Sequence, residues 1–289
     1  MLKFQRSYKL TIELDDGGDA IIITPPFTIR FNVNRSVMSS LNTMDISIYN
    51  LAPQTRHRIF QDRFNTANYK RVILEGGYGQ QLSTLFIGGM YEANSGREGV
   101  DIITRINCFG GFFDVRNTRV YKTIAAGQTQ KQILTSLVQD FPHISANPVI
   151  GGVGDVRMPR SVTVNGNLWN FIKTFSSPIK PFIDNEQVII MKDSEVRSSL
   201  ITVIDASTGL LQTPRRDGGY LTLTTLFEPR VNMGQQMQVS STVEPIYNGI
   251  HKVIGIQHEG IISDAQNGDL RSVFQLLTGS QIFNYTEVS

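Results

Sequence analysis

Few residues in this chain could do chemistry, since its 289 residues include one cysteine and four histidines. Nucleophilic hydrolysis needs an activated Ser or Cys beside a His and a carboxylate, and no Gly-x-Ser-x-Gly turn occurs. The sequence also contains neither a His-x-x-x-His pair nor a cysteine pair, which are the usual spacings of metal ligands. The histidines are scattered over the chain, at His57, His143, His251 and His258. We therefore expect no catalytic residue, no cofactor site and no metal site.

Structural roles account better for the cysteine and for two of the histidines. Cys108 lies in the alternating run 103–109, where a small buried side chain in a strand is the expected role. His251 and His258 are an odd number of residues apart in one predicted strand, which places them on opposite faces of a sheet.

Two further segments resemble binding motifs without meeting their requirements. The glycine-rich residues 151–155 lack the Lys and Ser/Thr of a phosphate-binding loop, and they lack the flanking strand and helix of a dinucleotide site. We interpret them as a flexible loop. The basic stretch 116–122 could touch phosphates, but an exposed linker between modules is the better account.

The composition is that of a folded protein, with 40% hydrophobic residues, 18% charged residues and a net charge of +2. No block of five or six like charges is present, which argues against a nucleic-acid arm or a polybasic membrane patch. The first residues lack the apolar stretch of a signal peptide, and no window approaches the ~18 apolar residues of a membrane span. We expect a protein made and folded in a reducing cytoplasm, with no membrane-spanning segment.

Residues 8–113 show mainly the alternation of short strands. Residues 27–33 alternate strictly, with Phe27 and the next three odd-numbered residues on one face. A hairpin is predicted from two apolar runs with the turn residues 15–19 between them, and the following Pro pair ends its ladder. Residues 95–97 are expected to bound one of the strands. The predicted elements are strands at 10–14, 20–24, 27–33, 43–49, 69–75, 83–91 and 100–109, and a short helix at 51–60.

Residues 125–195 change in character and predict a small α+β module. Helical spacing of apolar residues predicts one helix over 128–141, and Asn167 is a plausible N-cap for a second over 168–175. Trp169 is expected to anchor the core of this module. A hairpin over 181–191 follows, and residues 147–160 form a glycine-rich loop between the two helices.

From residue 200 the pattern returns to strands, and the two β regions can be laid on each other. The predicted strands are 201–204, 220–226, 237–241, 249–258 and 270–277. The order 69–75, 82–91 and 100–109 matches the order of the last three of these, and both middle strands carry a mid-strand glycine that suggests a bulge. The sequence thus predicts a mainly β fold, with two related tube-like β-barrel modules, 1–120 and 199–289, flanking an α+β module, 121–198.

One stretch of the C-terminal region resembles a known family. Residues 208–214 and 221–239 are similar to the Gly-Leu-x-x-x-Pro, strand, Pro, Gly, strand run of the baseplate hub proteins of contractile-tailed bacteriophages. This family includes the Mu-type hub and the N-terminal half of type VI secretion spike proteins. The strand 249–260, ending His-x-Gly, and the run 44–51 before the short helix also resemble the family. Pro229 and Gly234 fit the motif because Pro cannot donate to a ladder and Gly permits a turn.

The resemblance implies a structural protein of the virion and not an enzyme. It implies a homotrimer whose six similar barrels adapt a sixfold tail tube to a threefold spike, contact other baseplate proteins and leave a channel for DNA ejection. The same resemblance covers phage-derived injection devices. Two alternatives stay open: another tube-like tail protein, such as a distal tail ring or tube initiator, and a virion-associated cell-wall-degrading enzyme.

Overall fold

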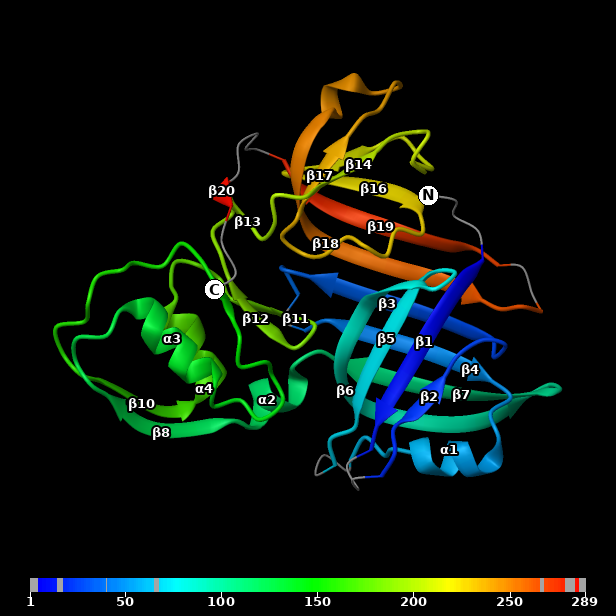
Figure 1. Cartoon of the computed structure of the whole chain (residues 1–289), viewed down its shortest axis with the longest axis horizontal. Helices are drawn as coiled ribbons and strands as arrows, with labels where there is room; N and C mark the ends of the chain where they lie inside the picture. Colours follow the sequence, from blue (N-terminus) through cyan, green and yellow to red (C-terminus); the bar gives the residue numbers. More distant parts are fainter. Residues whose placement is uncertain are drawn as a thin grey trace.

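The computed structural model describes residues 5–14, 18–39, 41–64, 68–265, 268–278 and 284–285, and most of its strands belong to one sheet (Figure 1). From the N-terminal region the sheet takes β1 (Arg6–Glu13), β2 (Ile21–Ile23), β3 (Ile29–Ser36), β4 (Thr43–Tyr49), β5 (Arg71–Tyr78), β6 (Gln81–Glu98) and β7 (Asp101–Phe109). From the C-terminal region it takes β14 (Ile201–Ile204), β15 (Arg215–Asp217), β16 (Tyr220–Leu226), β17 (Gln236–Val239), β18 (Gly249–Ile262) and β19 (Leu270–Leu277).

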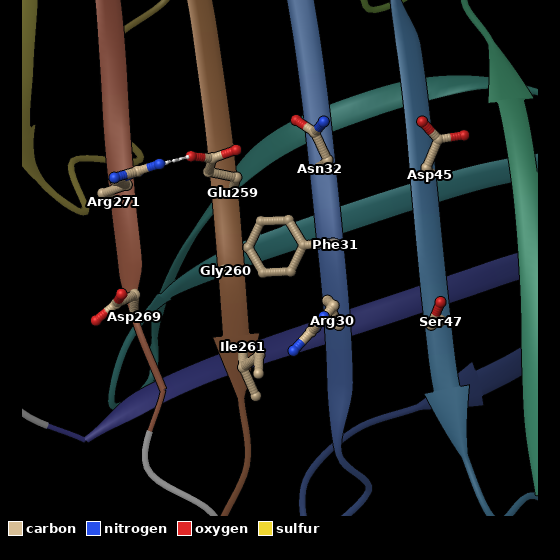
Figure 2. Close-up of a pocket in the computed structure, with 10 residues that line it drawn as sticks. All are labelled: Arg30, Phe31, Asn32, Asp45, Ser47, Glu259, Gly260, Ile261, Asp269 and Arg271. Atoms are coloured by element: carbon tan, nitrogen blue, oxygen red, sulfur yellow. Dashed lines mark hydrogen bonds and ion pairs between the residues drawn. The ribbon is translucent and has the colours of Figure 1, made fainter. Parts of the chain in front are cut away.

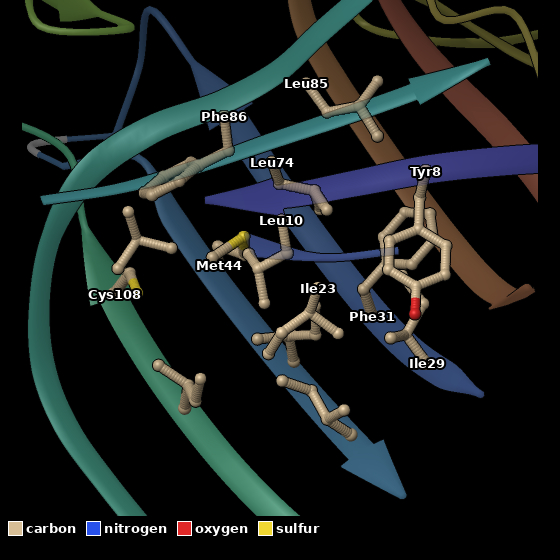
Figure 3. Packing of buried hydrophobic residues seen from close by; sticks show 14 of the residues in the cluster. Tyr8, Leu10, Ile23, Ile29, Phe31, Met44, Leu74, Leu85, Phe86 and Cys108 are labelled. Carbon is tan, nitrogen blue, oxygen red and sulfur yellow. The ribbon is translucent and has the colours of Figure 1, made fainter. Parts of the chain in front are cut away.

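Alternation explains the strands that the sequence predicts best. In β3 the residues Ile29, Phe31 and Val33 are buried while their neighbours face solvent, so one face of the strand joins the core. Figure 3 shows Ile29 and Phe31 packed with side chains of β1, β4 and β6, and Val33 belongs to the same core. Phe27 was expected on the same face, but it lies before β3, behind the Pro pair, and its side chain is exposed.

The N-terminal hairpin and the short helix agree with the sequence. β1 and β2 pair antiparallel, with Leu10 opposite Ile23, while turn residues 15–17 lie outside the described part of the chain. Helix α1 (Pro53–Ile59) begins with Pro in its first turn, and the ammonium of Lys70 donates to carbonyls at its C-terminal end.

The strands of the two β regions form one continuous sheet. Residues 255–262 of β18 pair antiparallel with β3, so the two regions are hydrogen-bonded to each other. Phe227 extends this junction, because its ring packs in the N-terminal core and its carbonyl accepts from the Tyr78 hydroxyl at 2.9 Å. The two separate barrels predicted from the sequence are not confirmed, and the described strands contain no closed barrel.

The sheet contains the same five-strand topology twice. The N-terminal repeat (β3 to β7) has the spatial order β3-β4-β7-β6-β5, and the C-terminal repeat (β15 to β19) has the order β15-β16-β19-β18-β17. Every neighbouring pair in both repeats is antiparallel. This extends to five strands the similarity that the sequence indicated for three.

β-bulges occur in the corresponding strands of the two repeats. The pairing of β6 with β7 shifts at Tyr91, and the pairing of β18 with β19 shifts at Ile254, beside Gly255. A Cβ on Gly255 would lie 2.7 Å from Oε1 and 3.1 Å from Cβ of Gln275, so the two strands approach closely beside the bulge. Residues 95–97, expected as a strand boundary, instead lie inside β6, which continues to Glu98.

The α+β region lies to one side of the sheet (Figure 1). It contains α2 (Phe112–Asn117), α3 (Gln130–Val138), α4 (Leu168–Phe175), β8 (Arg119–Ile124), β9 (Val149–Ile150), β10 (Val162–Asn167), β11 (Phe182–Asp184), β12 (Gln187–Ile190) and β13 (Glu195–Val196). β13 pairs with β20 (Asn284–Tyr285), and a 3-10 turn, η1 (Pro245–Tyr247), precedes β18. No helix in the described ranges is long and apolar enough to cross a membrane.

Local signals in the α+β region were interpreted correctly where they concern helices. Asn167 caps α4 by accepting the Asn170 amide at 2.9 Å, and Trp169 is buried in the core between α3 and α4. The stretch 116–122 is not a linker, because it forms the last turn of α2 and most of β8, which pairs with β10.

Candidate functional site

The polar turn at residues 184–186, between β11 and β12, connects the α+β region to the N-terminal repeat. Asp184 pairs with Gln187 across a two-residue hairpin loop, and both loop residues have positive φ, 49° at Asn185 and 57° at Glu186. Glycine is the residue that best tolerates this conformation at the second loop position. Glu186 occupies it instead and is almost fully buried, so its side chain must compensate for the backbone strain.

Asp184 reaches the sheet through a buried ion pair. Its carboxylate lies 3.3 Å from Arg35 Nη1 on β3, and both side chains are almost inaccessible to solvent. Asn42 donates to the same carboxylate at 3.2 Å and to the Ile183 carbonyl at 3.0 Å. Arg35 also donates to the Val231 carbonyl of the C-terminal repeat at 3.4 Å. A single arginine therefore contacts all three regions of the chain.

The other two turn residues contact two more strands of the N-terminal repeat. Asn185 Oδ1 accepts the Ile87 amide of β6 at 3.0 Å. The Glu186 carboxylate accepts from Arg71 Nε on β5 at 2.7 Å and from the Tyr69 hydroxyl. Burial raises the pKa of the Glu186 carboxyl, while Tyr69 and Arg71 oppose that rise. Burial and the neighbouring Glu186 together raise the pKa of Tyr69.

A second polar cluster lies beside the turn. The Asp114 carboxylate of α2 accepts the backbone amides of His143 and Ile144 at 2.9 and 2.8 Å, and it lies 2.6 Å from His143 Nδ1. The His143 ring stacks on Tyr69 at 3.7 Å between ring centroids. This His–Asp pair fixes the loop after α3 against β5, and Tyr69 connects it to Glu186.

Lys252 links the C-terminal repeat to the loop that follows β12. Its ammonium is buried and donates to the Lys192 carbonyl at 2.7 Å. Burial lowers the pKa of Lys252 to about 8, although Asp193 and Glu195 favour the charged form. Together with the turn 184–186, this contact holds the three regions as one body.

The solvent face of the sheet at the β3–β18 junction carries charges of both signs. A groove of about 430 Å³ lies over β19, β18, β3 and β4 (Figure 2), lined by Arg30, Asn32, Asp45, Glu259 and Arg271 among others. Arg271 Nε donates to Glu259 at 2.6 Å, and Asn107 donates to Asp45. The lining holds Arg30 and Arg271 against Asp45, Glu259 and Asp269, a net charge of −1, so the groove offers no concentrated positive field to a phosphate.

The residues considered for chemistry lie apart from one another. Cys108 is buried in β7, and burial raises the pKa of its thiol. His258 is buried against Ser272 Oγ at 2.8 Å, and His251 contacts the Tyr247 carbonyl. The odd spacing of His251 and His258 does not imply opposite faces, because the bulge at Ile254 interrupts the alternation between them.

Sequence reasoning predicted the hairpin over 181–191 but missed the buried contacts of its turn, although one signal pointed to them. Arg35 continues the buried series Ile29, Phe31 and Val33 at two-residue spacing, and a charge at a core position requires a buried partner. The alternation could thus have marked Arg35, but the identity of Asp184 depends on tertiary structure. Within the described residues, no group of three or more His, Cys, Asp or Glu could hold a metal ion.

Comparison with known proteins identifies the family. The model of the family described as baseplate hub gp41 matches residues 8–260. This chain belongs to the baseplate hub gp41 family. The resemblance deduced from the C-terminal motif is thereby confirmed, and a structural role in a phage tail baseplate follows for this hub protein. A search of curated protein sequences gave no match.

Solved structures share the fold of the hub protein at low sequence identity. A tail protein from Neisseria meningitidis MC58 has a TM-score of 0.61 at 10% identity, with 96% of this chain and 99% of that chain covered. The 43 kDa tail protein of prophage MuSo2 from Shewanella oneidensis has a TM-score of 0.61 at 9% identity, with 94% and 98% covered. An Escherichia coli component of the type VI secretion system has a TM-score of 0.59 at 10% identity, with 96% and 79% covered. The fold is therefore that of phage tail proteins.

Proposed function

We propose that this hub protein forms a homotrimeric ring in the baseplate of a contractile phage tail. Each chain carries the same five-strand topology twice, so three chains present six related β units around one axis. Such a ring matches a sixfold tail tube on one side and a threefold spike on the other. The duplicated topology is the observation that carries this proposal. In the ring, the β units 1–120 and 199–289 of each chain form tube-like barrel modules. They flank the α+β module, residues 121–198, in the sequence.

Spike and tube proteins are the proposed partners, together with other baseplate proteins. The Escherichia coli neighbour is described as a type VI secretion component with similarity to the T4 tail proteins gp27 and gp5, and two further neighbours come from a PdpA–VgrG complex. These neighbours favour a position next to a central spike. The continuous sheet gives the chain the rigidity that such a position requires, and so do the buried polar contacts of the turn 184–186, of Asp114 and of Lys252.

DNA ejection through the ring is the proposed use of its channel. The net charge of −1 in the groove on the sheet face supports passage without capture, because a surface without excess positive charge does not bind phosphates strongly. The protein is made and assembled in the bacterial host cytoplasm and ends in the virion baseplate. It acts as a scaffold and not as an enzyme, with no catalytic residue, cofactor or metal.

Solution mass tests the proposal against a monomer of 32.3 kDa. Light scattering on the purified protein, alone and mixed with the spike protein, should give about three times that mass in at least one sample. A persistent monomer in both samples would contradict the hub ring. The alternatives have their own tests: turnover of purified cell wall would indicate a wall-degrading enzyme, and a sixfold ring would indicate a tube initiator or distal tail ring.

A further inference from the structure

Strand β6 leaves one edge open along its last five described residues, 94–98. Its first half, residues 81–89, pairs with β5, and Ala93 exchanges two backbone hydrogen bonds with Gln61. Beyond Ala93, the described part of the structure pairs residues 94–98 with β7 alone. N–H and C=O groups alternate between the two sides of an antiparallel strand, so those of Ser95 and Arg97 point to the open side, as those of Ala93 do.

The equivalent half of β18 is covered by another strand. After the bulge at Ile254, residues 255–262 pair with β19 on one side and with β3 on the other. After the bulge at Tyr91, β6 pairs with β7 in the same way, but the described residues place no strand where β3 lies on β18. The two repeats therefore differ at one place in the described structure. β18 of the C-terminal repeat pairs with β3, the first strand of the N-terminal repeat, whereas β6 of the N-terminal repeat pairs with no such first strand.

A strand that corresponds to β3 lies at the other end of the sheet. β15 is the first strand of the C-terminal repeat, as β3 is of the N-terminal repeat, and in the described structure it pairs only with β16. Its residues Arg215, Arg216 and Asp217 are exposed. The open edge of β6 and the open edge of β15 lie at opposite ends of one chain's set of repeats, so two copies can meet head to tail.

We propose that β15 of one copy adds to the open segment of β6, residues 94–98, in the next copy, repeating between chains the β3–β18 pairing within the chain. This inference rests on the proposed ring and names its interface. Three copies then contain six such strand pairings, three β3–β18 pairings within chains and three β15–β6 pairings between chains, and each repeat pairs with the next around the ring. Such a head-to-tail interface uses two different surfaces, and it forms a closed ring when the rotation between copies closes.

The internal pairing predicts the register between copies. The first pair after the bulge is Glu92 with Asn107 in the N-terminal repeat and Gly255 with Gln275 in the C-terminal repeat. Ser95 and His258 each lie three residues further along, so they occupy corresponding positions. Within the chain, His258 lies opposite Val33.

The same comparison places β15 on β3. Asn34 pairs with Thr43, which pairs with Phe109; Asp217 pairs with Tyr220, which pairs with Leu277. Phe109 and Leu277 occupy the same place in their repeats, so Asp217 corresponds to Asn34 and Arg216 to Val33. Arg216 of one copy therefore lies opposite Ser95 of the next.

The two segments carry small net charges of opposite sign. Residues 92–98 of β6 hold Glu92 and Glu98 against Arg97, a net charge of −1, and β15 holds Arg215 and Arg216 against Asp217, a net charge of +1. Opposite charges on neighbouring strands stabilise antiparallel pairing, whereas two copies of β15 would repel each other. The edge charges also discourage unspecific strand addition, which keeps the open edge of a free chain from aggregating.

A cysteine pair tests the predicted register. Facing residues of antiparallel strands have Cα atoms about 4.5–5.5 Å apart, a distance that a disulfide spans. The double variant Ser95→Cys with Arg216→Cys, mildly oxidised, should give dimers and trimers on a non-reducing gel, and reductant should dissolve them. Single variants alone should stay monomeric on that gel, and a mixture of the two should stop at dimers. Native Cys108 is buried and provides no competing thiol.

A matched control is Ser95→Cys with Tyr121→Cys, because Tyr121 is exposed on the distant β8. It should give no covalent oligomer under the same oxidation. A trimer by light scattering without the Ser95–Arg216 link would overturn this interface and leave the proposed hub ring standing. Absence of the link together with a monomer, with and without the spike protein, would overturn both.

Discussion

Arg35 and Asp184 lie 149 residues apart in the sequence and form a buried ion pair, with Arg35 Nη1 3.3 Å from Asp184 Oδ1. The pair joins the first strand of the N-terminal repeat to the hairpin of the α+β region. Because Arg35 also contacts the Val231 carbonyl, it holds the C-terminal repeat at the same point. The proposed ring requires such a fixed junction between the two repeats.

Breaking this ion pair should destabilise the chain strongly. Asp184→Asn removes the charge that compensates buried Arg35, and the loss of one partner of a buried pair costs about 3–5 kcal/mol. Urea unfolding should show this as a lower midpoint. Glu75→Gln, which breaks the partly exposed pair with Lys9, is the control and should change the free energy of unfolding by less than about 1 kcal/mol. Equal effects of the two variants would contradict the burial of the Arg35 pair.

Lys252 should make stability depend on alkaline pH. Its pKa falls from 10.5 to about 8 in the folded chain, so between these values the unfolded chain holds a proton that the folded chain has released. Stability contributed by Lys252 therefore rises as pH increases from 8 to 10.5 and is lost as pH falls through 8.

The comparison variant is Lys252→Met, which cannot titrate. The difference in unfolding free energy between wild type and variant should grow by roughly 2–3 kcal/mol over that pH interval, at 1.36 kcal/mol per pKa unit. Taking the difference cancels the titration of groups common to both proteins. A difference that stays constant from pH 8 to 10.5 would show that Lys252 keeps an ordinary pKa.

Trp169→Ala should weaken the α+β region. The indole is buried between α3 and α4, and truncating a buried Trp costs about 3–5 kcal/mol. Amide hydrogen exchange should show the loss first in α3 and α4, because the substitution leaves the sheet core intact. The control Tyr121→Ala, at an exposed ring, should stay within about 0.5 kcal/mol of wild type.

Gly234→Val should disrupt the turn before β17. Gly234 has a φ of +79°, and a Cβ there would lie 3.1 Å from the Met191 sulfur. β-branched residues resist positive φ, at a cost of order 1–3 kcal/mol before any clash is counted. Thermal melting should fall for this variant and stay unchanged for Gly219→Val, where nothing lies within 4 Å of the added Cβ and φ is not positive. An unchanged melting curve for Gly234→Val would disprove the strained turn.

Elements fixed by neighbouring residues could be predicted from the sequence. The Asn167 cap, the start of α1 at Pro53 and the alternation of β3 each depend on a few consecutive side chains. The bulge beside Gly255 was predictable for the same reason, since a glycine inside an apolar strand marks a close approach.

What the sequence did not predict depends on distant contacts. The local pattern of residues 116–122 favours a linker, because β10, the partner of β8, lies about 40 residues further along the chain. The β3–β18 pairing, which turns two β regions into one sheet, joins segments more than 200 residues apart. The polar turn combines residues of β3, β5, β6 and β11, and no local pattern in any one of them names the other three.

Electron cryo-microscopy of the purified assembly viewed along its axis tests the central claim most directly. The account predicts a closed ring of three copies whose six β repeats follow one another at nearly equal angles, with β15 of each copy beside β6 of the next. A ring of six copies, or three copies joined through surfaces that leave β6 and β15 open, would contradict it.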